Sequence, residues 1–319
     1  MKVFFSNYHI SVNPTLVDDL LAAGLEVVVP RDDFQGIHIG FFAPNTEHFN
    51  KPGVIPVTYA EYLTMEPMAM IIPCEQMIKD FKLLRESRGN VDVIVYLTAN
   101  SNAADTYPDD SDFVISHDLY YHRATKAKYK IWYFNQPTFE IEPKTEEEIR
   151  EAFDNKHVNL YVNNFYDSGF EPELQAANQF RELYQNAFGV RVNFFGYGNE
   201  DGWPQPPVTH QHMKDSMFTL CFKRRETWGQ MVNESMQIGT PCIFMEDLMW
   251  STFKDYLINQ DISIIGCNAF GLVDAIINMT FDDYLVMVKE AQWQSRMYCN
   301  TEINVEKLKW LFNKVEEVL

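Results

Sequence analysis

The feature that most constrains the fold is a repeated alternation of short apolar runs with amphipathic, helix-like segments. In the first half, helical periodicity marks Asn13–Ala23, Cys74–Arg88 and Leu119–Ala127. The apolar runs between them are interpreted as strands: Lys2–Ser6, Leu25–Val29, Ile37–Phe42, Val54–Val57, Ala69–Ile72, Val91–Leu97, Asp112–Ser116 and Lys130–Phe134. Because this rhythm is typical of βα units, it predicts an α/β fold with a mostly parallel sheet.

The alternation is interrupted once and then begins again. The interruption is the charged stretch 141–157, which contains Pro143 and is interpreted as a linker with a short helix. The second series of strands is Val158–Val162, Arg191–Phe195, Thr219–Phe222 and Pro241–Met245, and two amphipathic helical patterns follow in Phe281–Leu319. A chain of 319 residues also fits two domains of ordinary size, so we expect two sequential α/β domains.

The bulk composition narrows the protein class. Apolar residues make up 46% of the chain, enough for substantial cores, and no apolar run approaches the roughly 20 residues that cross a bilayer. The five cysteines are odd in number and form no CxxC pair, which disfavours a disulfide framework or a zinc site. The first residues do not resemble a signal peptide. We therefore expect a soluble cytoplasmic protein without a membrane partner.

The net charge restricts the kind of partner. A formal charge of −19 opposes purely electrostatic binding to nucleic acid or to an anionic membrane. The first half also contains no basic amphipathic helix of the kind that lies on bilayers. Any polyanionic partner would therefore need a local positive patch.

Two glutamates eight positions apart define the most informative motif, Glu226-Thr-Trp-Gly-Gln-Met-Val-Asn-Glu234. The turn at Trp228-Gly229 precedes a helical pattern, and the unpaired amides of a helix N-terminus attract anions. Glu226 is expected in the loop before the helix and Glu234 about two turns into it. A solvated amphipathic helix with two exposed glutamates is the alternative that spacing alone leaves open.

This motif resembles the E-x7-E signature of retaining glycosyltransferases with the GT-B fold, the clan of glycogen and sucrose synthases. Arg225 before the first glutamate, Ser-Met after the second, and the following Gly-Thr-Pro and apolar strand extend the match. The resemblance implies two Rossmann-like domains that face a central cleft. The expected boundaries are an acceptor-side domain at 1–140, the linker at 141–157, a donor-binding domain at 158–285, and C-terminal helices at 286–319 that pack back toward the first domain.

The resemblance also implies roles for individual residues around a nucleotide-sugar donor. Glu226 would contact the transferred sugar and Glu234 the ribose, and the diphosphate would lie at Trp228-Gly229. Arg225, together with Arg224 or Lys223, would compensate the departing diphosphate in a catalytic step that retains the anomeric configuration. The design requires no metal and no cofactor besides the donor as co-substrate.

Two further sites are expected on the donor side. Gly196-x-Gly198 follows a strand and, in the resembled family, such a pair helps to form the donor pocket, although glycines after strands are often only turns. His210 lies where the family places residues against the nucleotide base. The i, i+2 pair His210 and His212 could also ligate a metal on a strand, but ordinary packing histidines are the commoner case.

One departure from the family pattern concerns its phosphate contacts. The family carries an arginine and a Lys-Gly pair near the first loop of the second domain. The corresponding stretch here, 163–169, has the sequence Asn-Asn-Phe-Tyr-Asp-Ser-Gly and contains no cation. Either Arg224 or Arg225 substitutes, or backbone amides bind the phosphate, or donor transfer has been lost.

A basic and aromatic stretch, 117–134, suggests where an acceptor could bind. His117, Arg123, Lys126 and Lys128 are interleaved there with tyrosines and a tryptophan, the residue types that contact phosphates and unstacked bases. The acceptor expected from this pattern is a hydroxymethylated DNA base, with a soluble glycan or small metabolite as the alternative. A solvated helix that leads into a buried strand would also produce the pattern. A nucleotide-sugar epimerase and a non-catalytic GT-B module remain open as well.

Overall fold

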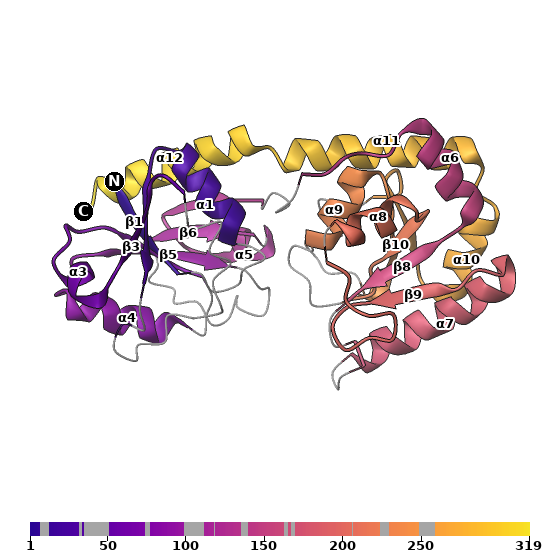
Figure 1. Ribbon diagram of the computed structural model, residues 1–319, viewed down its shortest axis with the longest axis horizontal. Helices are drawn as coiled ribbons and strands as arrows, with labels where there is room; N and C mark the ends of the chain where they lie inside the picture. Colours follow the sequence, from indigo (N-terminus) through magenta and orange to yellow (C-terminus); the bar gives the residue numbers. More distant parts are fainter. Residues whose placement is uncertain are drawn as a thin grey trace. The chain divides into compact units, whose positions relative to one another are not determined.

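The computed structural model describes residues 1–6, 13–31, 34, 51–73, 77–98, 112–117, 119–134, 140–162, 165–166, 170–205, 207–223, 230–248 and 259–319. The chain forms two compact units. Unit 1 comprises Met1–Thr138 together with Cys299–Leu319, and unit 2 comprises Phe139–Tyr298. Each unit is an α/β layer structure with its own parallel sheet (Figure 1).

Unit 1 contains a seven-stranded sheet in the order β3-β2-β1-β4-β5-β6-β7, and all its strand pairs are parallel. The strands are β1 (Lys2–Phe5), β2 (Glu26–Pro30), β3 (Val54–Val57), β4 (Ala69–Ile72), β5 (Val93–Thr98), β6 (Phe113–Ser116) and β7 (Tyr129–Trp132). The helices are α1 (Asn13–Ala22), α3 (Tyr59–Leu63), α4 (Ile78–Ser87), α5 (Leu119–Ala124) and α12 (Thr301–Glu316).

Both faces of this sheet are apolar because successive side chains of a strand point to opposite faces. Val3 and Phe5 face one cluster, which α1 and α12 cover, whereas Phe4 faces a second cluster beside α3 and α4. Figure 1 shows the same division, with α12 and α1 on one side of the sheet and α3 and α4 on the other. The last helix of the chain is therefore a structural part of the first unit.

A buried polar contact joins α1, β7 and α12. The Tyr133 hydroxyl donates to Asp19 Oδ2 at 2.8 Å, and Asn304 Nδ2 donates to the carbonyl oxygen of Phe134. Burial is the main reason why the pKa of Asp19 rises from 3.8 to about 6, although hydrogen bonds from Tyr133 and Asn304 oppose the rise. This contact fixes α12 in register with the edge strand.

A second buried cluster closes the other face of unit 1. Arg88 donates to both oxygens of Asp92, at 2.8 and 3.1 Å, and the side chains of both residues are almost fully buried. Asp92 also accepts from the Tyr62 hydroxyl and from the Met68 amide, each at 3.0 Å. The carboxylate is thus satisfied on all sides, as a buried charge requires.

Unit 2 contains a five-stranded parallel sheet in the order β12-β11-β10-β8-β9. The strands are β8 (Val158–Tyr161), β9 (Val192–Phe195), β10 (Phe218–Leu220), β11 (Cys242–Met245) and β12 (Ser263–Gly266). The helices are α6 (Glu146–Asn155), α7 (Glu171–Phe188), α8 (Val208–Lys214), α9 (Gln230–Ile238), α10 (Ala269–Ile277) and α11 (Phe281–Tyr298), with the short 3-10 helix η4 (Glu246–Leu248).

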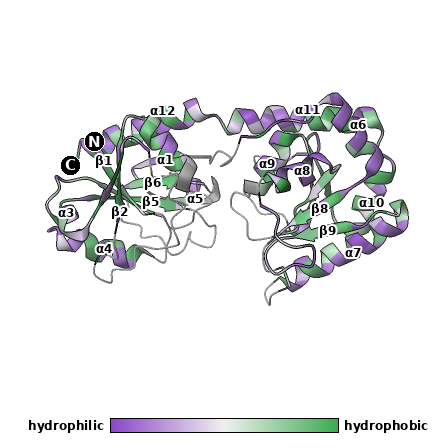
Figure 2. Cartoon of the chain, viewed as in Figure 1, coloured by the Kyte–Doolittle hydropathy of each residue, from purple (hydrophilic) through white to green (hydrophobic). Residues whose placement is uncertain are grey.

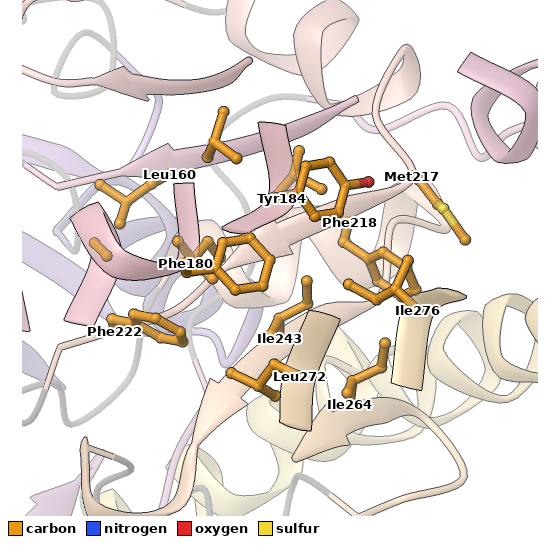
Figure 3. Packing of buried hydrophobic residues seen from close by; sticks show 14 of the residues in the cluster. Leu160, Phe180, Tyr184, Met217, Phe218, Phe222, Ile243, Ile264, Leu272 and Ile276 are labelled. Atoms are coloured by element: carbon orange, nitrogen blue, oxygen red, sulfur yellow. The ribbon is translucent and has the colours of Figure 1, made fainter. Parts of the chain in front are cut away.

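The core of unit 2 forms mainly between its sheet and the helices α7, α10 and α11. Figure 3 shows Phe180 and Tyr184 of α7 against Phe218 and Ile243 of the strands, and Leu272 of α10 beside them. The strands of both sheets are mainly hydrophobic in Figure 2, whereas the helices carry a hydrophilic and a hydrophobic face. This is the arrangement expected of helices that cover a buried parallel sheet.

The α/β architecture predicted from the sequence is confirmed, with a parallel sheet in each unit. The expected strand at 37–42 lies outside the described residues. Strand β12 and helix α10 were not predicted from the sequence. Among the described residues, no helix is both long and apolar enough to cross a membrane.

Candidate functional site

The strand order of unit 2 changes direction at β8. The chain proceeds from β8 to β9 on one side, whereas β10, β11 and β12 extend on the other. In open α/β sheets, ligands bind outside the carboxyl ends of the strands at such a switch point. The candidate site therefore lies where β8 and β10 end, next to the turn after β9 and the helix α9.

The turn after β9 is packed closely against the end of β8. Gly196 has φ +135°, and a Cβ atom there would lie 2.4 Å from the carbonyl oxygen of Val162. The Asn199 side chain donates to the carbonyl oxygens of Val162 and Phe195 and accepts from the Phe165 amide at 3.2 Å. Gly198 also has a positive φ, +80°. Both predicted glycines thus belong to a braced turn at this edge.

Buried hydroxyl groups fix helix α9 against β10 and against the end of α8. Thr219 Oγ1 of β10 and Ser235 Oγ of α9 lie 2.6 Å apart, and Ser235 also donates to the carbonyl oxygen of Thr240. The Thr240 hydroxyl in turn donates to the carbonyl oxygen of Met213 at the end of α8. The helix ends at Gly239, whose φ of +94° suits a glycine after a C-terminus.

The contact between α8 and α9 brings two predicted donor-site residues together. His210 Nε2 lies 3.3 Å from Glu234 Oε2, and about 11% and 12% of their side chains are exposed. Glu234 is the fifth residue of α9, so it lies about 6 Å along the axis from Gln230. The pair places a carboxylate at the middle of α9, on the side of the helix that packs against α8.

The remaining donor-side predictions fall partly outside the described residues. Lys223 is described and partly exposed, just beyond the end of β10. Arg224, Arg225, Glu226, Trp228 and Gly229 lie in the interval 224–229, outside the described residues.

Two aromatic side chains near the glycine turn were not singled out from the sequence. Tyr197 and Trp203 are 60% and 58% exposed, and their ring centroids lie 5.7 Å apart in an edge-to-face arrangement. They flank the same turn as Gly198. The available signal was a tyrosine between the two glycines and a tryptophan directly after Gly202, since large exposed aromatics commonly contribute to binding surfaces.

In unit 1, the predicted acceptor residue His117 lies at the carboxyl end of β6 and is 2% exposed. Its Nδ1 donates to the carbonyl oxygen of Tyr133 at 2.9 Å. Burial lowers the pKa of His117 to about 4, despite that hydrogen bond, so the ring is neutral at pH 7. Its Nε2 is buried and has no hydrogen-bond partner in the described part of the chain.

Of the predicted acceptor cations, Lys128 lies away from His117. Arg123 lies near the end of α5, and Lys126 and Lys128 lie in the connection to β7. Because β6 and β7 are parallel, Lys128 lies at the amino edge of the sheet and His117 at its carboxyl edge. Lys128 Nζ instead lies 4.9 Å from the centre of the Tyr129 ring.

Within the described residues, no cluster of three or more His, Cys, Asp or Glu side chains is placed to hold a metal ion. His212, the second member of the predicted histidine pair, stacks on Phe195 with ring centroids 4.7 Å apart. His210 contacts Glu234 instead. The two histidines lie on the helix α8 rather than on a strand, so residues two positions apart point in different directions.

Known structures share the fold of this chain. Sucrose-phosphate synthase from Thermosynechococcus elongatus superimposes with a TM-score of 0.62 at 13% identity, over 100% of both chains. TarM of S. aureus gives a TM-score of 0.59 at 13% identity, over 77% of this chain and 55% of TarM. The chain has the GT-B fold. A DNA-modifying β-glucosyltransferase also matches, with a TM-score of 0.51 at 13% identity, over 100% of this chain and 99% of that chain.

The relationship to these proteins is one of fold. The chain matches no protein-family model, and no curated protein sequence matches it. The chain spans only about half, 55%, of the length of TarM. Since a GT-B fold supports more than one activity, the function has to be argued from the site itself.

Proposed function

We propose that this protein is a retaining, metal-independent glycosyltransferase that moves a sugar from a nucleotide-sugar donor to a soluble acceptor. The observation that carries the proposal is the His210–Glu234 pair at the switch point of the unit 2 sheet. Glu234, the second glutamate of the E-x7-E motif, lies on α9, and His210 lies on α8. The braced glycine turn after β9 lies next to these helices. The similar structure of TarM was determined in complex with UDP, and that of the β-glucosyltransferase with uridine diphosphoglucose.

In this proposal, Glu234 accepts hydrogen bonds from the ribose hydroxyls of the donor. His210 orients the carboxylate, because a hydrogen bond to one oxygen fixes the direction of the other. The exposed rings of Tyr197 and Trp203 offer a surface against which the base can lie. These roles use described residues only.

The reacting end of the donor is assigned to the interval that begins after Lys223. Glu226 contacts the hydroxyls of the transferred sugar and favours the positive charge that develops at its anomeric carbon. The amides of Trp228-Gly229 and the side chains of Arg224 and Arg225 compensate the diphosphate as it departs. The acceptor attacks from the same face, and the leaving phosphate takes its proton.

Two acceptor classes are proposed for testing, a hydroxymethylated base in DNA first and a soluble glycan second. The DNA-modifying β-glucosyltransferase shares the fold, which favours the first class. The charge of −19 and the separation of Lys128 from His117 across the sheet favour the second. A donor panel with either acceptor, assayed for nucleotide release, distinguishes transfer from epimerisation and from binding alone.

The decisive variants are Glu226→Ala and Glu234→Ala in the full chain. Each is expected to reduce transfer by about 100-fold or more while the circular dichroism spectrum stays unchanged. Gln211→Ala, on the exposed side of α8, is the matched control and should transfer at the normal rate. Near-normal transfer by both glutamate variants, or no donor turnover by the wild type with any acceptor, would overturn the proposal.

A further inference from the structure

A hollow lies on unit 1, and its described lining shares no residue with the candidate site of unit 2. It is bounded by α5, the edge strand β7 and the first three turns of α12, and has a volume of about 760 Å³. That volume falls within the roughly 300–1,000 Å³ typical of small-molecule sites. Its walls include the basic and aromatic stretch that the sequence singled out, but they also include residues of the last helix.

The hollow has aromatic and aliphatic walls that are held in place. Trp132 packs on Phe134, with ring centroids 4.2 Å apart, and its Nε1 donates to the carbonyl oxygen of His117 at 3.4 Å. Trp310 meets the edge of the Tyr129 ring and keeps 46% of its surface exposed. Ile303 lies about two helical turns before Trp310 and continues the apolar surface. Flat, preorganised rings of this kind bind the apolar face of a ligand without ordering costs.

The positive and negative side chains around these rings are equal in number among the described residues. Lys130 and Lys307 contribute two positive charges, and Glu302 and Glu306 contribute two negative charges. Burial and the two nearby lysines lower the pKa of His122 to about 4, so this wall residue adds no charge at pH 7. The described residues that line the hollow thus carry no net charge, so the lining by itself is not a positive patch of the kind that binds a phosphate backbone.

The same groups supply both kinds of hydrogen bond. Lys130 Nζ donates to the carbonyl oxygen of Thr125 at 2.9 Å, and Lys307 Nζ donates to that of Trp132 at 2.8 Å. An ammonium carries three N–H groups, so these bonds use one donor each. Glu302 is exposed at the mouth and accepts only. A ligand rich in hydroxyl groups, each both donor and acceptor, matches this mixture.

We propose that the hollow of unit 1 is a saccharide-binding site, in which a sugar ring lies on Trp310 and its hydroxyls bind Lys307 and Glu302. The site is independent of the donor site in unit 2 and gives the protein a non-catalytic hold on a glycan. A polyanion is disfavoured because the lining is neutral. A purely apolar ligand is disfavoured because four charged side chains surround the rings.

The test is a titration of the full chain, without donor, with maltose, cellobiose, lactose and N,N′-diacetylchitobiose, followed by isothermal titration calorimetry, which does not depend on the tryptophan that is replaced. At least one disaccharide is expected to bind with a dissociation constant in the millimolar range or tighter. Trp310→Ala should weaken that binding by about 10-fold or more, and Trp310→Phe should retain most of it. Trp293→Ala is the matched control, because Trp293 is 61% exposed on α11 of unit 2.

The outcomes separate this site from the proposed donor site. Glu234→Ala should bind the disaccharide normally, and Trp310→Ala should still release nucleotide from the donor. The inference is overturned if no disaccharide binds the wild type, if Trp310→Ala binds as tightly as the wild type, or if Trp310→Ala loses affinity for duplex DNA instead.

Discussion

His210 Nε2 lies 3.3 Å from Glu234 Oε2, and the two residues are 24 positions apart on adjacent helices. Neither helix alone forms a site. The contact depends on the hydroxyl chain from Thr219 through Ser235 and Thr240, which fixes α9 against β10 and the end of α8. A change in that buried chain is therefore expected to alter the geometry of the carboxylate.

The first prediction concerns the positioning role of His210. His210→Ala should raise the KM for the donor by about 10-fold, because a hydrogen bond to a charged group contributes about 1.5–3 kcal/mol. His210→Gln, which retains an N–H donor, should restore part of the affinity. Donor titrations of the wild type and both variants measure the effect. Equal KM values for all three would rule out a positioning role.

The second prediction concerns the turn after β9. Gly196→Ala should destabilise the protein by about 3 kcal/mol or more, because it combines an unfavourable φ with a Cβ only 2.4 Å from a backbone oxygen. Gly202→Ala is the matched control, since its φ is +82° but nothing lies within 4 Å of an added Cβ. It should cost about 1–2 kcal/mol. Thermal unfolding of both variants provides the comparison, and equal costs would contradict it.

The third prediction concerns pH. The folded state raises the pKa of Asp19 from 3.8 to about 6, so it binds more protons than the unfolded chain between those values. The contribution of Asp19 to stability is therefore greatest below about pH 4 and falls as the pH rises to 6. Asp19→Asn should stabilise unit 1 by up to about 3 kcal/mol at pH 7.5 and by far less near pH 4.

Denaturant unfolding of the wild type and of Asp19→Asn, at pH 4.5 and pH 7.5, measures this difference. Asp18→Asn is the neighbouring control, because Asp18 is 46% exposed and pairs with Lys51 at the surface. A benefit of Asp19→Asn that is the same at both pH values would refute the role of Asp19 ionisation.

The fourth prediction concerns the buried pair of Arg88 and Asp92. Asp92→Ala should destabilise unit 1 by about 3–5 kcal/mol, because it leaves the guanidinium of Arg88 buried without its carboxylate. Hydrogen exchange of the β4 and β5 amides, which flank the pair, measures the loss. Glu86→Ala, an exposed change on α4 two residues before Arg88, should stay within about 0.5 kcal/mol of the wild type. Similar exchange in both variants would contradict the prediction.

The fold could be predicted from the sequence because buried parallel strands have a clear signature. Strands such as β4 and β8 are short runs of apolar residues between helical patterns, and their positions agree with those predicted. β12 was missed because Ser263–Gly266 contains only two strongly apolar residues. α10 was missed because Ala269–Ile277 is apolar at nearly every position, exposed ones such as Phe270 and Ile277 included, so its helical period is hard to see in the sequence.

The site was predictable only where a motif carried it. Glu234 was predicted from its spacing to Glu226, but its contact with His210 depends on how α8 packs on α9. For the predicted acceptor residues, closeness in the sequence did not predict closeness in the fold. His117 and Lys128 are close in sequence, yet β6 and β7 place them at opposite edges of the sheet. A pattern of residue types along the chain does not reveal such a separation.

The membership of α12 in unit 1 determines the order in which the chain can fold as it is synthesised. Leu308, Leu311 and Phe312 share a core with Val3 and Phe5 of the first strand. Unit 2, which is continuous from Phe139 to Tyr298, is complete before these residues emerge from the ribosome. The first unit to begin is thus the last to close, and until then its sheet exposes the apolar face that α12 covers, which is the state in which a chaperone would recognise it.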